Sequence, residues 1–63
     1  MTGRTYRVVM FHEVENETQW EGVALDERLP YPWRESVVQA DAAGYDVGTR
    51  WPIGRWHYGE RVS

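Results

Sequence analysis

The chain has 63 residues, a net charge of −3 and no cysteine, so neither a disulfide framework nor a thiolate zinc site is available to it. Its longest apolar run, residues 8–11, is too short to cross a bilayer, and residues 1–7 lack the apolar stretch of a secretory signal. We therefore expect one small cytoplasmic domain over residues 1–63, with no membrane partner.

Residues 4–14 alternate in the period of a strand. One face of this strand would carry Tyr6, Val8, Met10, His12 and Val14, and the other Arg7, Val9, Phe11 and Glu13. Because both faces hold apolar residues, the pattern predicts a central strand, or a strand whose second face meets a partner.

A second strand is predicted over residues 19–26, after a polar turn at residues 15–18. Trp20 and Ala24 share one of its faces. Gly22 indicates a bulge or a close approach of another part of the chain. The short connection favours an antiparallel hairpin with the first strand.

A helix is predicted after the proline-rich residues 29–32. Pro32 suits its first turn, and Gly44 suits the position just past its end. Its apolar stripe would be Trp33, Val37, Ala40 and Val38. A shorter helix beginning at Ser36 would use a capping box. The competing interpretation is a strand over residues 33–40, which would make the protein an all-β small barrel.

A second hairpin is predicted from strands at residues 45–51 and 55–62 around Pro52-Ile53-Gly54, where Trp51-Pro52-Ile53-Gly54 suits a type I turn. An even-numbered loop would place Trp51 and Trp56 on the same face, where both would be core residues. A three-residue loop, with its glycine in the left-handed region, would place them on opposite faces. The even loop separates apolar from polar residues more cleanly, and we favour it.

Together these elements predict an α+β fold in the order β-β-α-β-β, with an antiparallel sheet and one helix packed on it. Nine of the residues are aromatic: four Trp, four Tyr and one Phe. So short a chain has few aliphatic residues with which to offset the entropy of ordering its backbone. Most of the aromatic side chains are therefore expected in the core.

No pattern in the sequence predicts catalysis, and we expect a protein that is not an enzyme and has no cofactor, metal or small-molecule substrate. The conceivable metal ligands are His12, Glu13, Asp46 and His57, whose spacing matches no zinc motif. Neither Ser36 nor Ser63 lies in a nucleophile motif.

The C-terminal residues 50–63 carry a charge of +2, whereas residues 1–29 carry −3 and residues 30–49 carry −2. In the favoured register, one polar strip is a candidate binding site formed by Arg50, Arg55 and His57, extended by Arg61. Arg, Trp and Tyr are enriched at protein interfaces. The sequence thus favours a small regulatory or accessory module that binds a protein partner or forms a homodimer through its sheet, such as an inhibitor, an antitoxin-like adaptor or a phage accessory protein. The alternative is a single-strand DNA- or RNA-binding module that stacks bases on the same hairpin.

Overall fold

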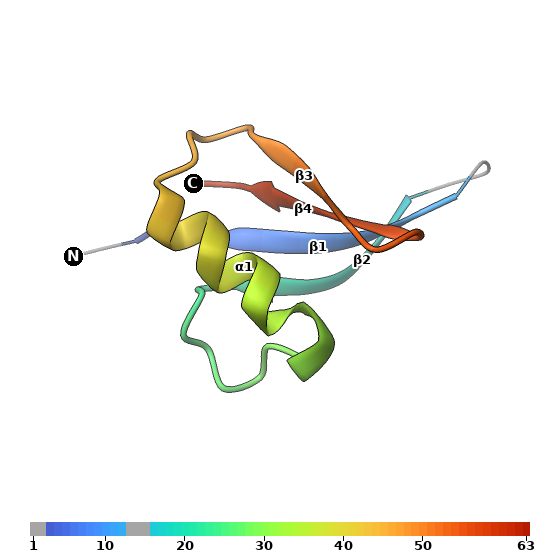
Figure 1. The fold of residues 1–63 in the computed structure, drawn as a ribbon, viewed down its shortest axis with the longest axis horizontal. Coiled ribbons are helices and arrows are strands. Elements are labelled where there is room, and N and C mark those ends of the chain that lie inside the picture. The colour runs from blue at the N-terminus through green and yellow to red at the C-terminus, as the bar shows by residue number, and fades with distance from the viewer. Residues whose placement is uncertain (1–2, 13–15) are drawn as a thin grey trace.

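The computed structural model describes residues 3–12 and 16–63. In chain order the elements are β1 (Tyr6–Phe11), β2 (Asn16–Gly22), α1 (Tyr31–Ala43), β3 (Arg50–Ile53) and β4 (His57–Arg61). The strands form one open sheet in the order β2-β1-β4-β3, with antiparallel neighbours throughout (Figure 1). The predicted α+β class and β-β-α-β-β order are confirmed. The all-β barrel is wrong, because residues 33–40 are helical.

The helix α1 begins at Tyr31, one residue before Pro32, and ends just before Gly44, close to the two residues that the sequence singled out. Pro32 lies in its first turn, where a missing N–H leaves no helical hydrogen bond unmade. Gly44 ends it in the left-handed region, at φ 73° and ψ 38°. The alternative capping box at Ser36 is wrong, since this residue lies inside the helix. Its hydroxyl instead accepts a hydrogen bond from the indole Nε1 of Trp51 at 2.7 Å.

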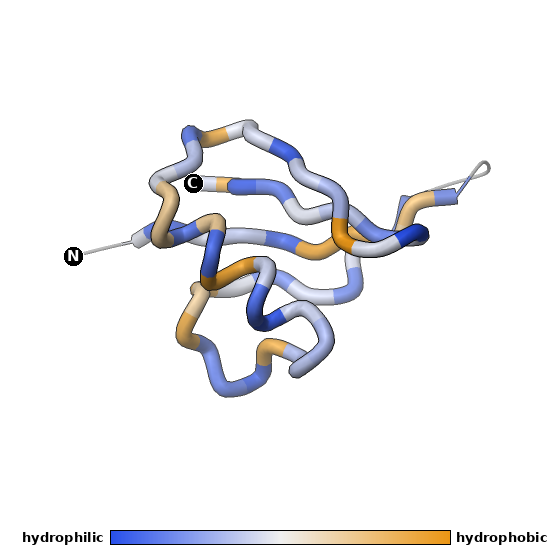
Figure 2. Tube along the Cα trace, in the orientation of Figure 1, coloured by the Kyte–Doolittle hydropathy of each residue, from blue (hydrophilic) through white to orange (hydrophobic). Residues whose placement is uncertain are grey.

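The core lies between α1 and one face of the sheet, which we call the covered face (Figure 1). Its buried residues come from β1, β2, α1 and the loop before α1: Tyr6, Val8, Trp20, Ala24, Leu29 and Val37. In the predicted helical stripe, Val37 and Ala40 are buried and Trp33 packs against the core, whereas Val38 is exposed. Hydrophobic segments are short and spread over several elements in Figure 2, so no single element supplies the core.

Strand β1 is central, as its two apolar faces predicted, with β2 on one side and β4 on the other. It is shorter than the predicted residues 4–14. Tyr6 and Val8 face the helix, and the alternate residues Val9 and Phe11 belong to the opposite face. The predictions made for Glu13 and Val14 lie outside the described residues.

Strand β2 begins earlier than predicted. Residues 16–18 belong to the strand rather than to a turn, and the rest of that predicted turn, Glu15, lies outside the described residues. The register against β1 shifts between Val8 and Val9. The irregularity in the sheet therefore lies here and not at Gly22. At Gly22 the side chain of Asp26 approaches the backbone closely, since a Cβ there would stand 2.7 Å from Oδ2 of Asp26.

The second hairpin has the odd loop, so the favoured even loop is wrong. Ile53 pairs with His57, which leaves residues 54–56 as a three-residue loop, and Gly54 has a φ of 66°. Trp51 therefore packs on the covered face, while Trp56 is 61% exposed.

The position of the tryptophan indole explains this register. Trp51 pairs across the sheet with Gly59, and a Cβ on that glycine would overlap the indole ring. The ring thus fills the space that the glycine leaves. Pro52, predicted to lie in the turn, instead lies in the edge strand β3, a position that proline tolerates. Of the predicted strand over residues 45–51, only residues 50–51 belong to β3, because residues 45–49 form the connection from α1.

Candidate functional site

The sheet face opposite α1, which we call the open face, has no second layer of described helix or strand over it. Directly paired residues of antiparallel strands share a face, so the register shows which side chains lie there together. They form two transverse rows. The charged row is Glu21, Arg7, Glu60 and Arg50, and the apolar row is Thr18, Val9, Tyr58 and Pro52.

The charged row crosses all four strands, and its neighbours carry opposite charges. Arg7 lies 3.9 Å from a carboxylate oxygen of Glu21 and 3.9 Å from one of Glu60. Arg50 lies 3.6 Å from the other oxygen of Glu60. The Nε of Arg7 is buried without a hydrogen-bond acceptor among residues 3–12 and 16–63. The row is therefore electrically neutral and retains one unused donor.

The apolar row packs the middle of the open face. Val9 is only 4% exposed although no described helix covers it, and it pairs with Thr18 of β2 and Tyr58 of β4. The guanidinium of Arg50 lies over the ring of Tyr58, with Cζ 5.3 Å from the ring centroid, which is a cation–π geometry. Beyond this row, Phe11 is 55% exposed.

A shallow hollow of about 300 Å³ lies beside the β3–β4 loop. Its walls include the apolar residues Phe11, Pro52 and Trp56, and the cations Arg50 and Arg55. The hollow continues the apolar row toward the end of the sheet. The exposed aromatic residues of the hairpin thus belong to the same surface as the open face.

The structure divides the four predicted binding residues between different places. Arg50 lies on the open face and Arg55 in the exposed loop at its end. His57 pairs with Ile53 on the covered face, and its ring centroid lies 5.2 Å from that of Trp33.

Arg61 does not join a binding strip either. Its guanidinium donates hydrogen bonds to the carbonyl of Tyr45 at 2.5 Å and to the carbonyl of Ser63 at 3.1 Å. It therefore holds the connection after α1 against the C-terminal strand. The strip predicted from the sequence does not form as one surface, because it rested on the even loop.

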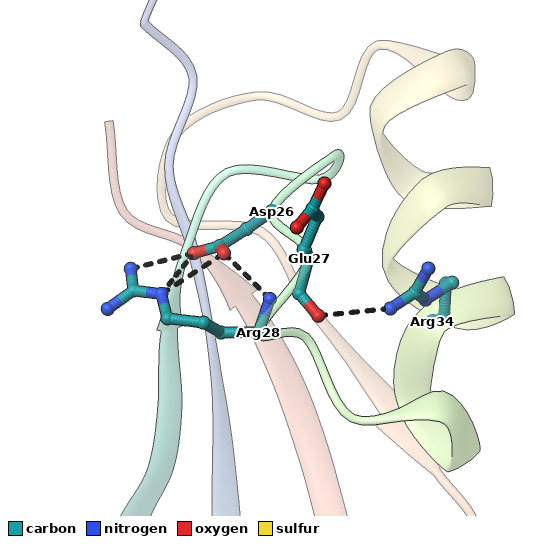
Figure 3. Close-up of polar contacts among 4 residues, drawn as sticks. All are labelled: Asp26, Glu27, Arg28 and Arg34. Atoms are coloured by element: carbon teal, nitrogen blue, oxygen red, sulfur yellow. Dashed lines mark hydrogen bonds and ion pairs between the residues drawn. The ribbon is translucent and has the colours of Figure 1, made fainter.

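A separate polar cluster in the loop before α1 satisfies its own hydrogen bonds (Figure 3). The guanidinium of Arg28 contacts both carboxylate oxygens of Asp26, with its Nη2 at 2.8 Å, and this bonding lowers the pKa of the carboxyl. Arg34 of α1 donates to the carbonyls of Glu27 and Leu29. These groups fix the loop to the helix, so we assign them a structural role.

Three of the conceivable metal ligands are described, namely His12, Asp46 and His57, whereas Glu13 is not. Within residues 3–12 and 16–63, no three His, Asp or Glu side chains are close enough to hold a metal ion together. The helix of the described chain is too short and too polar to span a membrane. Comparisons with protein-family models, curated proteins and solved structures gave no match to this chain.

Most of the open face is not evident from the sequence as a candidate site. The sequence pattern indicates a second apolar face on β1, but it does not connect Arg7 with Glu21 and Glu60. Alternation along β1 indicates that Arg7 lies on the face opposite Tyr6 and Val8. Its partners depend on the strand order and on the register, which the sequence pattern did not specify.

Proposed function

We propose that this chain is a small, non-enzymatic, regulatory or accessory module that binds another protein chain through its open face. The observation that supports this is the pairing of an exposed apolar surface, which includes Phe11 and Trp56, with a neutral row of opposite charges. Protein interfaces combine aromatic anchors with a polar margin in this way. A cytoplasmic location belongs to the same proposal, since small secreted domains usually rely on disulfides and this one has no cysteine.

The polar groups of the open face suit a protein partner better than a nucleic acid. Binding to a phosphate backbone depends on cations that are not already neutralised. Arg7 and Arg50 both lie beside glutamates in the charged row. An apolar surface with balanced charges favours a protein surface of similar composition.

Single-strand DNA or RNA binding is the second candidate, favoured by the hollow beside the β3–β4 loop. There Arg55 and the exposed ring of Trp56 could contact a phosphate and stack on a base. On this candidate, affinity for a single strand should fall steeply with salt and be lost in Arg55→Ala. No binding at low salt would exclude it.

The proposed function is tested by capturing proteins on the wild-type chain and on two surface variants. Phe11→Ser changes an exposed residue of the open face, and Leu25→Ser changes an equally apolar residue that is 86% exposed in the loop before α1. We expect the wild-type chain and Leu25→Ser to hold the same protein at a fixed stoichiometry. Untagged copies of this chain count as such a protein. Phe11→Ser should lose that protein.

Equal capture by all three chains would contradict the proposal, as would the absence of any stoichiometric protein. Capture that is lost on nuclease treatment would favour the second candidate. Circular dichroism of both variants establishes that the loss of a partner does not come from unfolding.

A further inference from the structure

The charged row of the open face is complementary to itself. In the order of the strands, Glu21, Arg7, Glu60 and Arg50 carry the charges minus, plus, minus and plus. Reversed end to end, the row reads plus, minus, plus, minus. A second copy placed face to face in the reversed order would therefore set an opposite charge over each of the four positions.

Only one orientation of a two-fold axis in the interface plane achieves this reversal. An axis parallel to the strands, passing between β1 and β4, reverses the strand order and sets each row over the same row of the second copy. Arg7 then faces Glu60 of the second copy, and Glu21 faces Arg50. An axis across the strands would instead place like charges over each other or set the charged row on the apolar row, both of which are unfavourable.

The apolar row is matched by the same operation. Val9 on β1 would face Tyr58 of the second copy on β4, and Thr18 would face Pro52. Because Val9 is only 4% exposed, the apolar area buried in the centre of the contact would come mainly from Tyr58 and Pro52. Face-to-face sheets with strands nearly aligned are a common packing, with an angle of about 30° that comes from sheet twist.

We propose that two copies of this chain dimerise by stacking their open faces about a two-fold axis that runs parallel to the strands between β1 and β4. This inference rests on the proposed function and names a second copy as the partner. The ion pairs within each row are long, at 3.6 to 3.9 Å, so the carboxylate oxygens and the terminal guanidinium nitrogens of the partly exposed Arg7 can also bond to the facing copy. The face of a four-stranded sheet with short strands is small, so the dissociation constant is expected in the micromolar range.

The test is a charge swap followed by sedimentation velocity over about 5 to 500 μM, a range that brackets a micromolar dimer. Arg7→Glu places a glutamate opposite Glu60 of its own second copy, and Glu60→Arg places two arginines opposite each other. Each variant alone is expected to lose dimerisation by on the order of a hundredfold. Mixed one to one, they restore opposite charges at all four positions and are expected to form a heterodimer of wild-type affinity.

Three further variants make the result independent of folding defects. Arg7→Gln and Glu60→Gln remove a charge without creating a like-charged pair, and each should weaken the dimer while circular dichroism stays unchanged. Glu35→Arg makes the same charge change as Glu60→Arg on the exposed part of α1, and should leave the dimer intact.

A wild-type chain that stays monomeric at 500 μM would overturn the dimer, as would single variants that dimerise normally or a mixture that fails to associate. These outcomes are separate from failure of the proposed function. If the chain is monomeric but still captures another protein through Phe11, only the dimer proposal fails. If it neither dimerises nor captures a protein, both proposals fail.

Discussion

The two faces of the sheet are built from alternate residues of the same strands, and they differ in what covers them. Val8 and Val9 are neighbours in β1, and both are almost fully buried. Val8 is covered by α1 and the loop before it. Val9 lies on the opposite face, between Thr18 of β2 and Tyr58 of β4. One strand therefore contributes to a core closed by its own chain and to a second face that no described helix or strand covers.

This difference indicates what each face is specialised for. On the covered face the contacts depend on shape, as where the indole of Trp51 lies on Gly59 and donates to Ser36. On the open face the contacts are ion pairs between partly exposed groups, which contribute little to stability and exchange readily with a partner. Substitutions should thus affect folding on the first face and association on the second.

The largest expected effect compares two leucines of the loop before α1. Leu29 is 1% exposed and Leu25 is 86% exposed. Leu29→Ala should lower the free energy of unfolding by about 2–5 kcal/mol, because it leaves a cavity in the core. Leu25→Ala should change it by less than about 0.5 kcal/mol. Urea unfolding of both variants measures the difference, and similar losses would contradict the assigned core.

A smaller effect is expected at the contact between β3 and β4. Gly59→Ala would push a methyl group into the indole of Trp51 and should cost about 1–3 kcal/mol of unfolding free energy. In Trp51→Leu, which removes that ring, the same glycine substitution should cost much less. A double-mutant cycle by urea unfolding measures this coupling. Additive effects would show that the ring does not lie on Gly59.

The stability of the fold at high pH depends on the buried Tyr6, whose hydroxyl donates to Oδ1 of Asp41 at 2.7 Å. Burial, followed by this carboxylate, raises the pKa of Tyr6 above its ordinary 10.0. The folded state therefore retains the proton longer than the unfolded state does. The resulting stabilisation is complete below pH 10 and is lost as the pH rises through the raised pKa.

Tyr6→Phe removes this titrating group and should lower the free energy of unfolding near neutral pH by about 1 kcal/mol, the usual value of one hydrogen bond. Between pH 9 and 11 the stability of the wild-type chain should fall more steeply than that of the variant. Urea unfolding across this range compares the two, and parallel curves would contradict the raised pKa.

The smallest effect is expected from the charges of the open face. Arg50 is exposed, and its ion pair with Glu60 is therefore worth less than about 1 kcal/mol. Arg50→Gln should leave thermal unfolding almost unchanged while it weakens dimerisation in the same preparation. A strong loss of stability with unchanged association would reverse the roles assigned to the two faces.

Local signals in the sequence predicted the parts of the fold that depend on local chemistry. Pro32 and Gly44 marked the ends of α1 because each residue has a backbone restriction or freedom that suits a helix end. Alternation along β1 separated its two faces. These properties need no knowledge of which strand lies beside which.

The register of the second hairpin could not be predicted in this way. It depends on a contact between residues eight apart, in which Gly59 leaves room for the ring of Trp51. One residue of slip exchanges the two faces of a strand, and it moved Trp56 from the expected core to the surface. The same slip separated Arg50 from His57 in the predicted strip, whereas Arg61 is held by its hydrogen bonds to the carbonyls of Tyr45 and Ser63.

Docking of the open face onto a second copy can be observed by isotope-filtered NOE measurement on a mixture of labelled and unlabelled chains. Only contacts between copies give signals in this experiment. We predict cross-peaks from the methyl group of Thr18 to the ring of Pro52, and none from the methyl groups of Val8. Cross-peaks that involve Val8, or the absence of any between copies at millimolar concentration, would contradict the claim.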